Sequence, residues 1–153
     1  MDTRFPMIRP GGFTLVELLV VIAVTGVLAA TALPGYVDLQ RDARAAVIRS
    51  AGASLRAVAT LAHARYVIAP QAWRDGAAMR IDTAAVTFRN GYPTADAGLA
   101  AAAGFDAGYS VRTGGGVLVV TPTGVADGAR CNVTYTETAQ APPAIVATTT
   151  DCS

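Results

Sequence analysis

The fold is decided by residues 12–35, which read GFTLVELLVVIAVTGVLAATALPG. From Phe13 to Leu33 every side chain is apolar or small except those of one glutamate and three threonines. A helix of this length, rising about 1.5 Å per residue, reaches about 30 Å, which is the thickness of the hydrocarbon core of a bilayer. The sequence therefore predicts a helix that is able to cross a membrane.

The charges on either side of this segment predict its orientation. Residues 1–12, MDTRFPMIRPGG, contain Arg4 and Arg9, and their prolines and glycines support neither helix nor strand. On the other side the first charges are balanced: Asp38, Arg41, Asp42 and Arg44. Because positive residues favour the cytoplasmic side, we expect residues 1–12 to be a cytoplasmic leader and the rest of the chain to be exported.

Two other interpretations of the segment stay open. A secretory signal peptide has a basic start, an apolar stretch and a small-x-small cleavage site, which Ala30-Thr31-Ala32 supplies. On that interpretation the protein is a secreted binding module. A plain membrane anchor leaves Glu17 unexplained, because a carboxylate among lipid tails costs several kcal/mol unless it is paired or close to the interface. Glu17 is therefore a candidate functional residue.

After Pro34-Gly35 the apolar pattern becomes that of an amphipathic helix, at about residues 36–66. Its predicted buried face consists of Leu39, Ala43, Ala46, Val47, Ser50, Ala51, Leu55, Val58 and Ala62. Pro34 has no N–H and its ring collides with the preceding turn, so the helix should be loosened there. Because the apolar period resumes at once, we expect one long helix with a weak point at Pro34.

The remainder of the chain predicts a small antiparallel sheet, and hence an α+β fold. The expected strands are residues 84–89, 109–112, 117–121, 131–137 and 144–149, and the last two are rich in β-branched side chains and bounded by Gly or Pro. Gly114-Gly115-Gly116 predicts a hairpin turn between the second and third of these. Residues 99–103 fit either a strand or a helical turn. Trp73, in a polar crossover, is expected to fold back onto the domain.

Composition argues against several classes of function. The net charge is +1, which gives no field strong enough to hold nucleic acid. The two cysteines, Cys131 and Cys152, have no zinc-type spacing, and a disulfide in an oxidising compartment is the better interpretation. The single histidine, His63, has no nucleophile to serve, so no catalytic residue is predicted. Asp106, Asp127 and Asp151 form no spaced ligand loop, so no metal or cofactor is predicted either.

The residues around the apolar segment resemble the type IV prepilin signature. Gly12 followed by Phe13-Thr14-Leu15-Val16-Glu17 and an apolar helix matches a short basic leader, a cleavage site after glycine, an N-methylated phenylalanine and a glutamate five residues into the mature chain. Pro34 falls where many pilins have a helix-loosening proline. Three further stretches resemble pilins of the mannose-sensitive haemagglutinin (MSHA) type: residues 34–39, 42–46 and 60–64, with a weaker likeness at 90–93.

This resemblance implies a type IV pilin fold and three regions: a cleaved leader at 1–12, a transmembrane and assembly half of the helix at 13–35, and a periplasmic head at 36–153. It implies no enzyme but a subunit that is inserted in the inner membrane, cleaved after Gly12 by a prepilin peptidase and N-methyltransferase, and polymerised by an assembly platform with other subunits into an adhesion fibre. The alternative is a pseudopilin or minor pilin with the same N-terminal chemistry.

The resemblance also assigns roles to single residues. Cleavage frees a cationic amine at Phe13, and Glu17 of a neighbouring subunit would pair with it in the fibre core, where neither group has water. Breaking such a pair costs about 3–5 kcal/mol, which is enough to fix the register between subunits. Pro34 is the assembly helix's weak point. Cys131 and Cys152 would bound the loop that pilins usually expose on the fibre surface.

Overall fold

The computed structural model describes residues 12–139 and 141–153, so the predicted leader up to residue 11 lies outside the described residues. Its main element is the helix α1, Leu15–Ile68, whose backbone continues without a break through Pro34. This confirms one long helix. Proline has no N–H, so the carbonyl of Ala30 loses its usual partner one turn later. Residues Leu15–Ala32 are long and apolar enough to cross a membrane.

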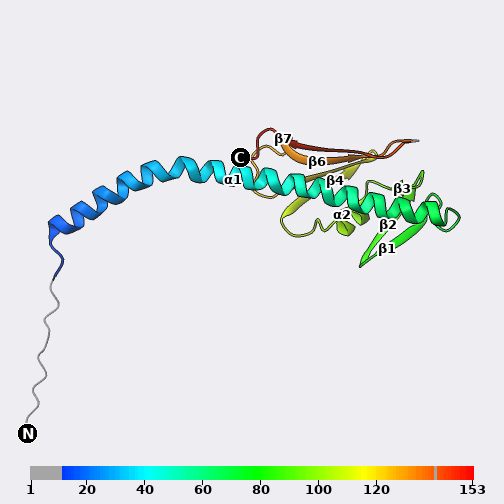
Figure 1. Cartoon of the computed structure of the whole chain (residues 1–153), viewed down its shortest axis with the longest axis horizontal. Helices are drawn as coiled ribbons and strands as arrows, with labels where there is room; N and C mark the ends of the chain where they lie inside the picture. Colours follow the sequence, from blue (N-terminus) through cyan, green and yellow to red (C-terminus); the bar gives the residue numbers. More distant parts are fainter. Residues whose placement is uncertain (1–11, 140) are drawn as a thin grey trace, which may run out of the picture. The chain divides into compact units, whose positions relative to one another are not determined.

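The chain divides into two compact units after Asp38, and the second unit, residues 39–153, contains the head. It contains β1 (Ala78–Ile81), β2 (Ala84–Arg89), β3 (Tyr92–Pro93), α2 (Ala97–Ala102), β4 (Tyr109–Gly114), β5 (Val117–Pro122), β6 (Cys131–Thr136) and β7 (Ala144–Thr149). The strands form two antiparallel sheets (Figure 1). The strand orders are β1-β2-β3 and β4-β5-β6-β7. The fold is α+β and like that of type IV pilins, as predicted.

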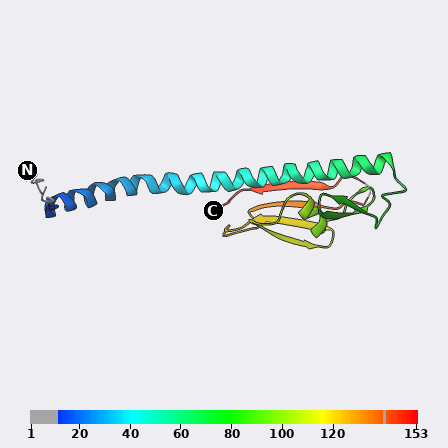
Figure 2. The ribbon, with the colours of Figure 1, turned by 90° about the horizontal axis from the view of Figure 1, so that it is seen from below.

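The second half of α1 packs along the four-stranded sheet (Figure 2). Ile48 and Leu55 are fully buried and share one core cluster with Leu118, Val120 and Val133 of β5 and β6. Gly52 is buried where the helix lies against the sheet, and a Cβ there would be in ordinary van der Waals contact with Val133 and Ala147, at 3.6 and 3.8 Å. Side chains on one face of β5 and β6 thus meet one stripe of the helix, which is the usual solution for an α+β domain.

The predicted buried face of the helix is wrong in its first half. Leu39, Ala43, Ala46, Val47 and Ser50 are exposed, whereas Ala51, Leu55, Val58 and Ala62 are buried as predicted. The buried positions that the pattern missed are Ala45, Ile48, Gly52 and Ala59. Alanine and glycine give little contrast in hydrophobicity between the two faces, and of the adjacent Val47 and Ile48 only Ile48 is buried. The position of the sheet, which the helix pattern does not contain, decides which side is buried.

The predicted single sheet is also incomplete, because the strand at 84–89 belongs to a separate three-stranded sheet with β1 and β3. The tight turn between β2 and β3 is Asn90-Gly91, both with positive φ, and this dipeptide is a strong hairpin signal that the strand assignment did not use. Gly115 and Gly116 turn the β4–β5 hairpin as predicted. Residues 97–102 are helical, and Trp73 packs near Phe88 with ring centroids 6.0 Å apart.

Candidate functional site

The start of α1 is open on every side. Phe13 is 82% exposed, and a Cβ on Gly12 would meet nothing within 4 Å, so the Gly12-Phe13 bond lies on accessible chain. All side chains from Leu15 to Ala32 are exposed as well. A helix that is apolar on all its faces is unfavourable in water, and it is suited either to lipid or to contact with other helices.

Within this apolar segment the polar side chains differ in whether they have a hydrogen-bond partner. The hydroxyl of Thr25 donates to the carbonyl of Val21 at 2.8 Å, and that of Thr31 donates to the carbonyl of Leu28 at 2.9 Å. Both threonines are therefore satisfied by their own helix. The Glu17 carboxylate has no hydrogen-bond or ion-pair partner among residues 12–139 and 141–153. Glu17 is the group that needs a partner from outside this half of the helix.

The structure also gives Glu17 a local role that the sequence analysis missed. Thr14 precedes the first helical residue, and its hydroxyl accepts a hydrogen bond from the backbone N–H of Glu17 at 3.3 Å. Thr and Glu three residues apart at a helix start form the pattern of a capping box, and a carboxylate in the first turn complements the helix dipole. The spacing Thr14-x-x-Glu17 is visible in the sequence and predicts this contact.

A second exposed surface lies in the head, on the side of α1 that faces away from the sheet. We call it the outer stripe, and it consists of exposed, uncharged residues three or four positions apart: Leu39, Ala43, Ala46, Ser50, Ala53, Ala57, Leu61, Ala64 and Ile68. Leu39, Leu61 and Ile68 are 66%, 47% and 83% exposed. The neighbouring arginines, such as Arg49 and Arg56, lie beside the outer stripe. Its first members are the residues predicted to be buried in the head.

The chain end is tied to the head by a disulfide and by charges. Cys131, at the start of β6, and Cys152 are bonded, with Cα atoms 5.0 Å apart, and both are buried. The Asp151 carboxylate lies 3.6 Å from Arg41 and 3.4 Å from Arg130. The backbone N–H of Ser153, one side-chain contact with Ser153 and the two arginines lower the pKa of Asp151. The terminus is therefore held against both the sheet and α1.

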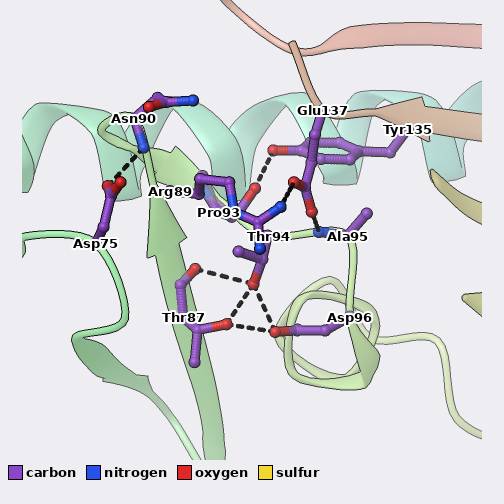
Figure 3. A network of polar contacts seen from close by, with 10 residues as sticks. All are labelled: Asp75, Thr87, Arg89, Asn90, Pro93, Thr94, Ala95, Asp96, Tyr135 and Glu137. Carbon is purple, nitrogen blue, oxygen red and sulfur yellow. Dashed lines mark hydrogen bonds and ion pairs between the residues drawn. The ribbon is translucent and has the colours of Figure 1, made fainter. Parts of the chain in front are cut away.

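A polar cluster joins the two sheets (Figure 3). Tyr135 of β6 is fully buried, and its hydroxyl donates to the carbonyl of Pro93 in β3 at 2.6 Å. Glu137, two residues later, accepts from the backbone N–H of Ala95 at 2.7 Å and from Arg89 of β2 at 3.1 Å. Burial raises the pKa of Tyr135, so its hydroxyl stays protonated and keeps donating.

The same cluster fixes the start of α2. Asp96 caps this helix by accepting from the backbone N–H of Leu99 at 2.9 Å, and its other oxygen accepts from the hydroxyls of Thr87 and Thr94. Partial burial alone would raise the pKa of Asp96, but these hydroxyl hydrogen bonds, with those of the Leu99 and Gly98 backbone, lower it. The cluster is a structural joint, since all its charged members are paired within the head.

Residues that the sequence analysis considered for chemistry are not brought together. The described part of the chain contains no group of three or more His, Cys, Asp or Glu side chains that could hold a metal ion. Asp127 accepts from the backbone N–H of Ala129 in its own turn, and Asp151 is paired with arginines. The ring of His63 stacks on that of Tyr92, with centroids 4.1 Å apart.

Comparison with known proteins agrees with the N-terminal pattern. The prokaryotic N-terminal methylation motif matches residues 7–33. A relative from Thermus thermophilus, the type IV narrow pilus major component PilA5, is 41% identical over 54 residues, which are 35% of this chain and 47% of the relative. The chain thus spans about half the length of the curated relative that it matches. No solved structure matches the chain.

Proposed function

We propose that this protein is a structural subunit of a type IV pilus. The observation that carries the proposal is the unpartnered carboxylate of Glu17 in a segment that matches the methylation motif. The rest of this helical segment is apolar, and the hydroxyls of Thr25 and Thr31 donate to carbonyls of the same helix. A membrane anchor gains nothing from such a group. A helix that leaves the lipid to bundle with copies of itself can use it, because each copy also carries a cationic terminus once it is cleaved.

The proposed sequence of events follows from the accessible N-terminal segment. Inserted in the inner membrane with residues 1–12 in the cytoplasm, the chain is cleaved after Gly12 by a prepilin peptidase, and the new amine of Phe13 is methylated. The methylated amine keeps its positive charge. In the fibre it pairs with Glu17 of a neighbouring subunit, while the exposed apolar side chains around it give adhesion without setting the register.

The outer stripe supports the same proposal from the head. An exposed uncharged face that continues from Leu39 to Ile68, with Arg49 and Arg56 beside it, marks a surface that another molecule covers. Its small side chains let a second helix come close, while Leu39, Leu61 and Ile68 supply apolar area. Polymerisation with other pilin subunits would cover it.

Among pilus subunits we propose a major pilin of the MSHA-like branch that forms an adhesion fibre. The disulfide between Cys131 and Cys152 supports this choice, because by family resemblance pseudopilins more often hold their heads with a calcium loop. The alternative, a pseudopilin or minor pilin, shares the chemistry of Gly12, Phe13 and Glu17 and differs in the amount of protein in the fibre.

Two measurements test the proposal. Intact mass and N-terminal sequencing of the exported protein should show a chain that begins at methylated Phe13. A chain that begins at Leu33 would contradict it and leave a secreted module cleaved after Ala32. Deleting the gene should remove the fibres seen by electron microscopy. If the fibres persist and change only in number, the protein is a minor pilin or pseudopilin.

A further inference from the structure

A groove in the head, which the proposed assembly does not use, lies between the second half of α1 and the chain that leads into β7. Its volume is about 570 Å³, which is within the range of small-ligand sites. One wall carries Arg56, Thr60 and His63 of α1, and the other carries Pro142, Pro143 and Ile145, with Tyr92 at one end. The groove thus combines a polar wall with an apolar one.

The positive charge of the groove has no partner in the head. Arg56 donates one N–H to the carbonyl of Ile145 at 3.0 Å, which fixes the guanidinium at the rim and leaves its other donors available. In the described part of the chain no carboxylate lines the groove, and none forms an ion pair with Arg56. A guanidinium held in this way is suited to a carboxylate, which it can bind with two parallel hydrogen bonds.

His63 supplies a second kind of polar group. Its Nδ1 lies 3.0 Å from the carbonyl oxygen of Gly91, and because a carbonyl only accepts, Nδ1 carries the hydrogen and donates. In the neutral ring Nε2 is then an acceptor, and it has no hydrogen-bond partner among the described residues. The ring cannot turn freely because it stacks on Tyr92 at an interplanar angle of 2°. A ligand that satisfies Nε2 must bring a donor such as a hydroxyl.

We propose that this groove binds an acidic sugar, a ring that carries one carboxylate and several hydroxyls. The carboxylate binds Arg56, hydroxyls bind Nε2 of His63 and the side chain of Thr60, and the apolar C–H face of the ring packs on Pro142, Pro143 and Tyr92. The groove is open to solvent, so the sugar enters either free or as one residue of an acidic polysaccharide. The binding does not depend on polymerisation.

The test uses the full chain, labelled with ¹⁵N, in detergent micelles, so that it stands whether or not the protein forms fibres. D-glucuronate should shift the NMR signals of Thr60, His63, Tyr92 and Ile145. Two analogues should each bind at least about tenfold more weakly than D-glucuronate: D-glucose, which lacks the carboxylate, and cyclohexanecarboxylate, which lacks the hydroxyls. A glucuronate oligomer that binds more tightly than the monomer identifies a polysaccharide as the source, and the reverse identifies the free sugar.

Matched variants locate the site. Arg56→Gln should weaken glucuronate binding about tenfold, and Thr60→Val, which removes a hydroxyl with no partner in the described head, should weaken it about threefold. Arg49→Gln, two turns earlier on α1 and outside the groove, should bind like the wild type. The proposal is overturned if glucose or cyclohexanecarboxylate binds as tightly as glucuronate, if no groove signal shifts with glucuronate, or if Arg49→Gln loses as much affinity as Arg56→Gln.

Discussion

At the scale of single residues, Glu17 has two roles that the structure makes separable. Its backbone N–H and position belong to the cap of α1 with Thr14, whereas its carboxylate is the group without a partner. A cap is worth about 0.5–2 kcal/mol to one helix, but leaving one charge of a buried pair unpaired costs about 3–5 kcal/mol. The charge therefore dominates wherever helices are bundled away from water.

Glu17→Gln should abolish fibres while leaving the protein inserted and cleaved at Gly12. Glutamine suits a capping box as well as glutamate does, so this change removes the charge and keeps the cap. Electron microscopy of cells that express only the variant measures the outcome. Thr14→Ala is the matched control, because it removes the cap hydroxyl and keeps the charge, and it should still give fibres. Normal fibres from Glu17→Gln would show that Glu17 acts through the cap and not through an ion pair.

Gly98, in the first turn of α2, is a residue whose effect comes from close contact. A Cβ at this position would lie 1.9 Å from the carbonyl oxygen of Ala85 in β2, and backbone cannot move aside as a side chain can. Gly98→Ala should therefore lower the free energy of unfolding of the head by about 1–3 kcal/mol, although alanine favours helices. Gly114→Ala, where a Cβ meets nothing within 4 Å, should change it by less than about 0.5 kcal/mol in the same urea titration. Equal effects of the two changes would contradict this account.

Among the helices and strands, features that depend on neighbouring residues in the sequence were predicted correctly. Features that depend on packing against a distant part of the chain were not. The apolar segment, the single long helix, the triple-glycine hairpin and the strand at 144–149 follow from period, length and turn chemistry. The side of α1 that is buried in its second half does not follow from them, because alanines occur on both sides of the helix. Packing against β5 and β6 determines which side is buried. β1 and β3, at four and two residues, are too short for a reliable period.

The candidate site shows the same division. Gly12, Phe13, Glu17 and Pro34 lie within one short stretch, so their pattern is complete in the sequence. The groove is assembled from α1, β3 and the residues before and within β7, which are separated by tens of residues. His63 was predicted to have a packing or solvated role, and its stacking on Tyr92 agrees with that. Nothing local in the sequence brings it together with Arg56 and the two prolines.

The cap of α2 makes the stability of the head sensitive to acid. The folded pKa of Asp96 lies below its unfolded value of about 3.9, so the folded head binds a proton more weakly than the unfolded chain does. The stabilisation by the carboxylate is thus complete above about pH 4 and is lost as the pH falls through the lowered pKa. Asp96→Asn should unfold about 1 kcal/mol more easily than the wild type at pH 7, and the difference should shrink towards pH 2 in urea titrations.

A matched control for this prediction is Asp106→Asn, since Asp106 is exposed and has no hydrogen-bond partner in the described head. The stability of the Asp106→Asn variant should follow that of the wild type from pH 7 to pH 2. A constant difference between Asp96→Asn and the wild type from pH 7 to pH 2 would mean that the contribution of Asp96 does not come from its ionised form.

At the scale of the whole molecule, the question is what holds the last strand in the head. β7 is an edge strand that pairs with β6 over six residues, and Arg56 of α1 donates to its Ile145 carbonyl. Beyond β7 the chain end is held by the disulfide, by the hydrogen bond from Arg44 to the Cys152 carbonyl at 3.2 Å, and by Asp151. The polar contacts are at the surface or half-buried, so each contributes little. The disulfide should contribute most.

Replacing both cysteines tests whether the disulfide contributes more than the polar contacts. Cys131→Ala with Cys152→Ala opens a loop closed by residues 21 apart in sequence, and the lost restriction of the unfolded chain predicts about 3 kcal/mol less stability. Alanine suits these two buried positions better than serine, whose hydroxyls would be left unpaired there. Urea unfolding of the full chain in micelles, with and without a reducing agent, measures the difference. The reducing agent should destabilise the wild type to the level of the variant and leave the variant unchanged, because the chain contains no other cysteine.

Hydrogen exchange should show where the stability is lost. β4 and β5 pair with each other without help from the disulfide, so their amides should stay protected in the reduced protein, and those of β7 should exchange first. Uniform loss of protection across the sheet would show that the bond stabilises the head only through the unfolded chain. Loss confined to β7 would show that the disulfide also holds an edge strand in place, next to the groove wall that Ile145 supplies. In that case reduction should weaken glucuronate binding together with β7 protection.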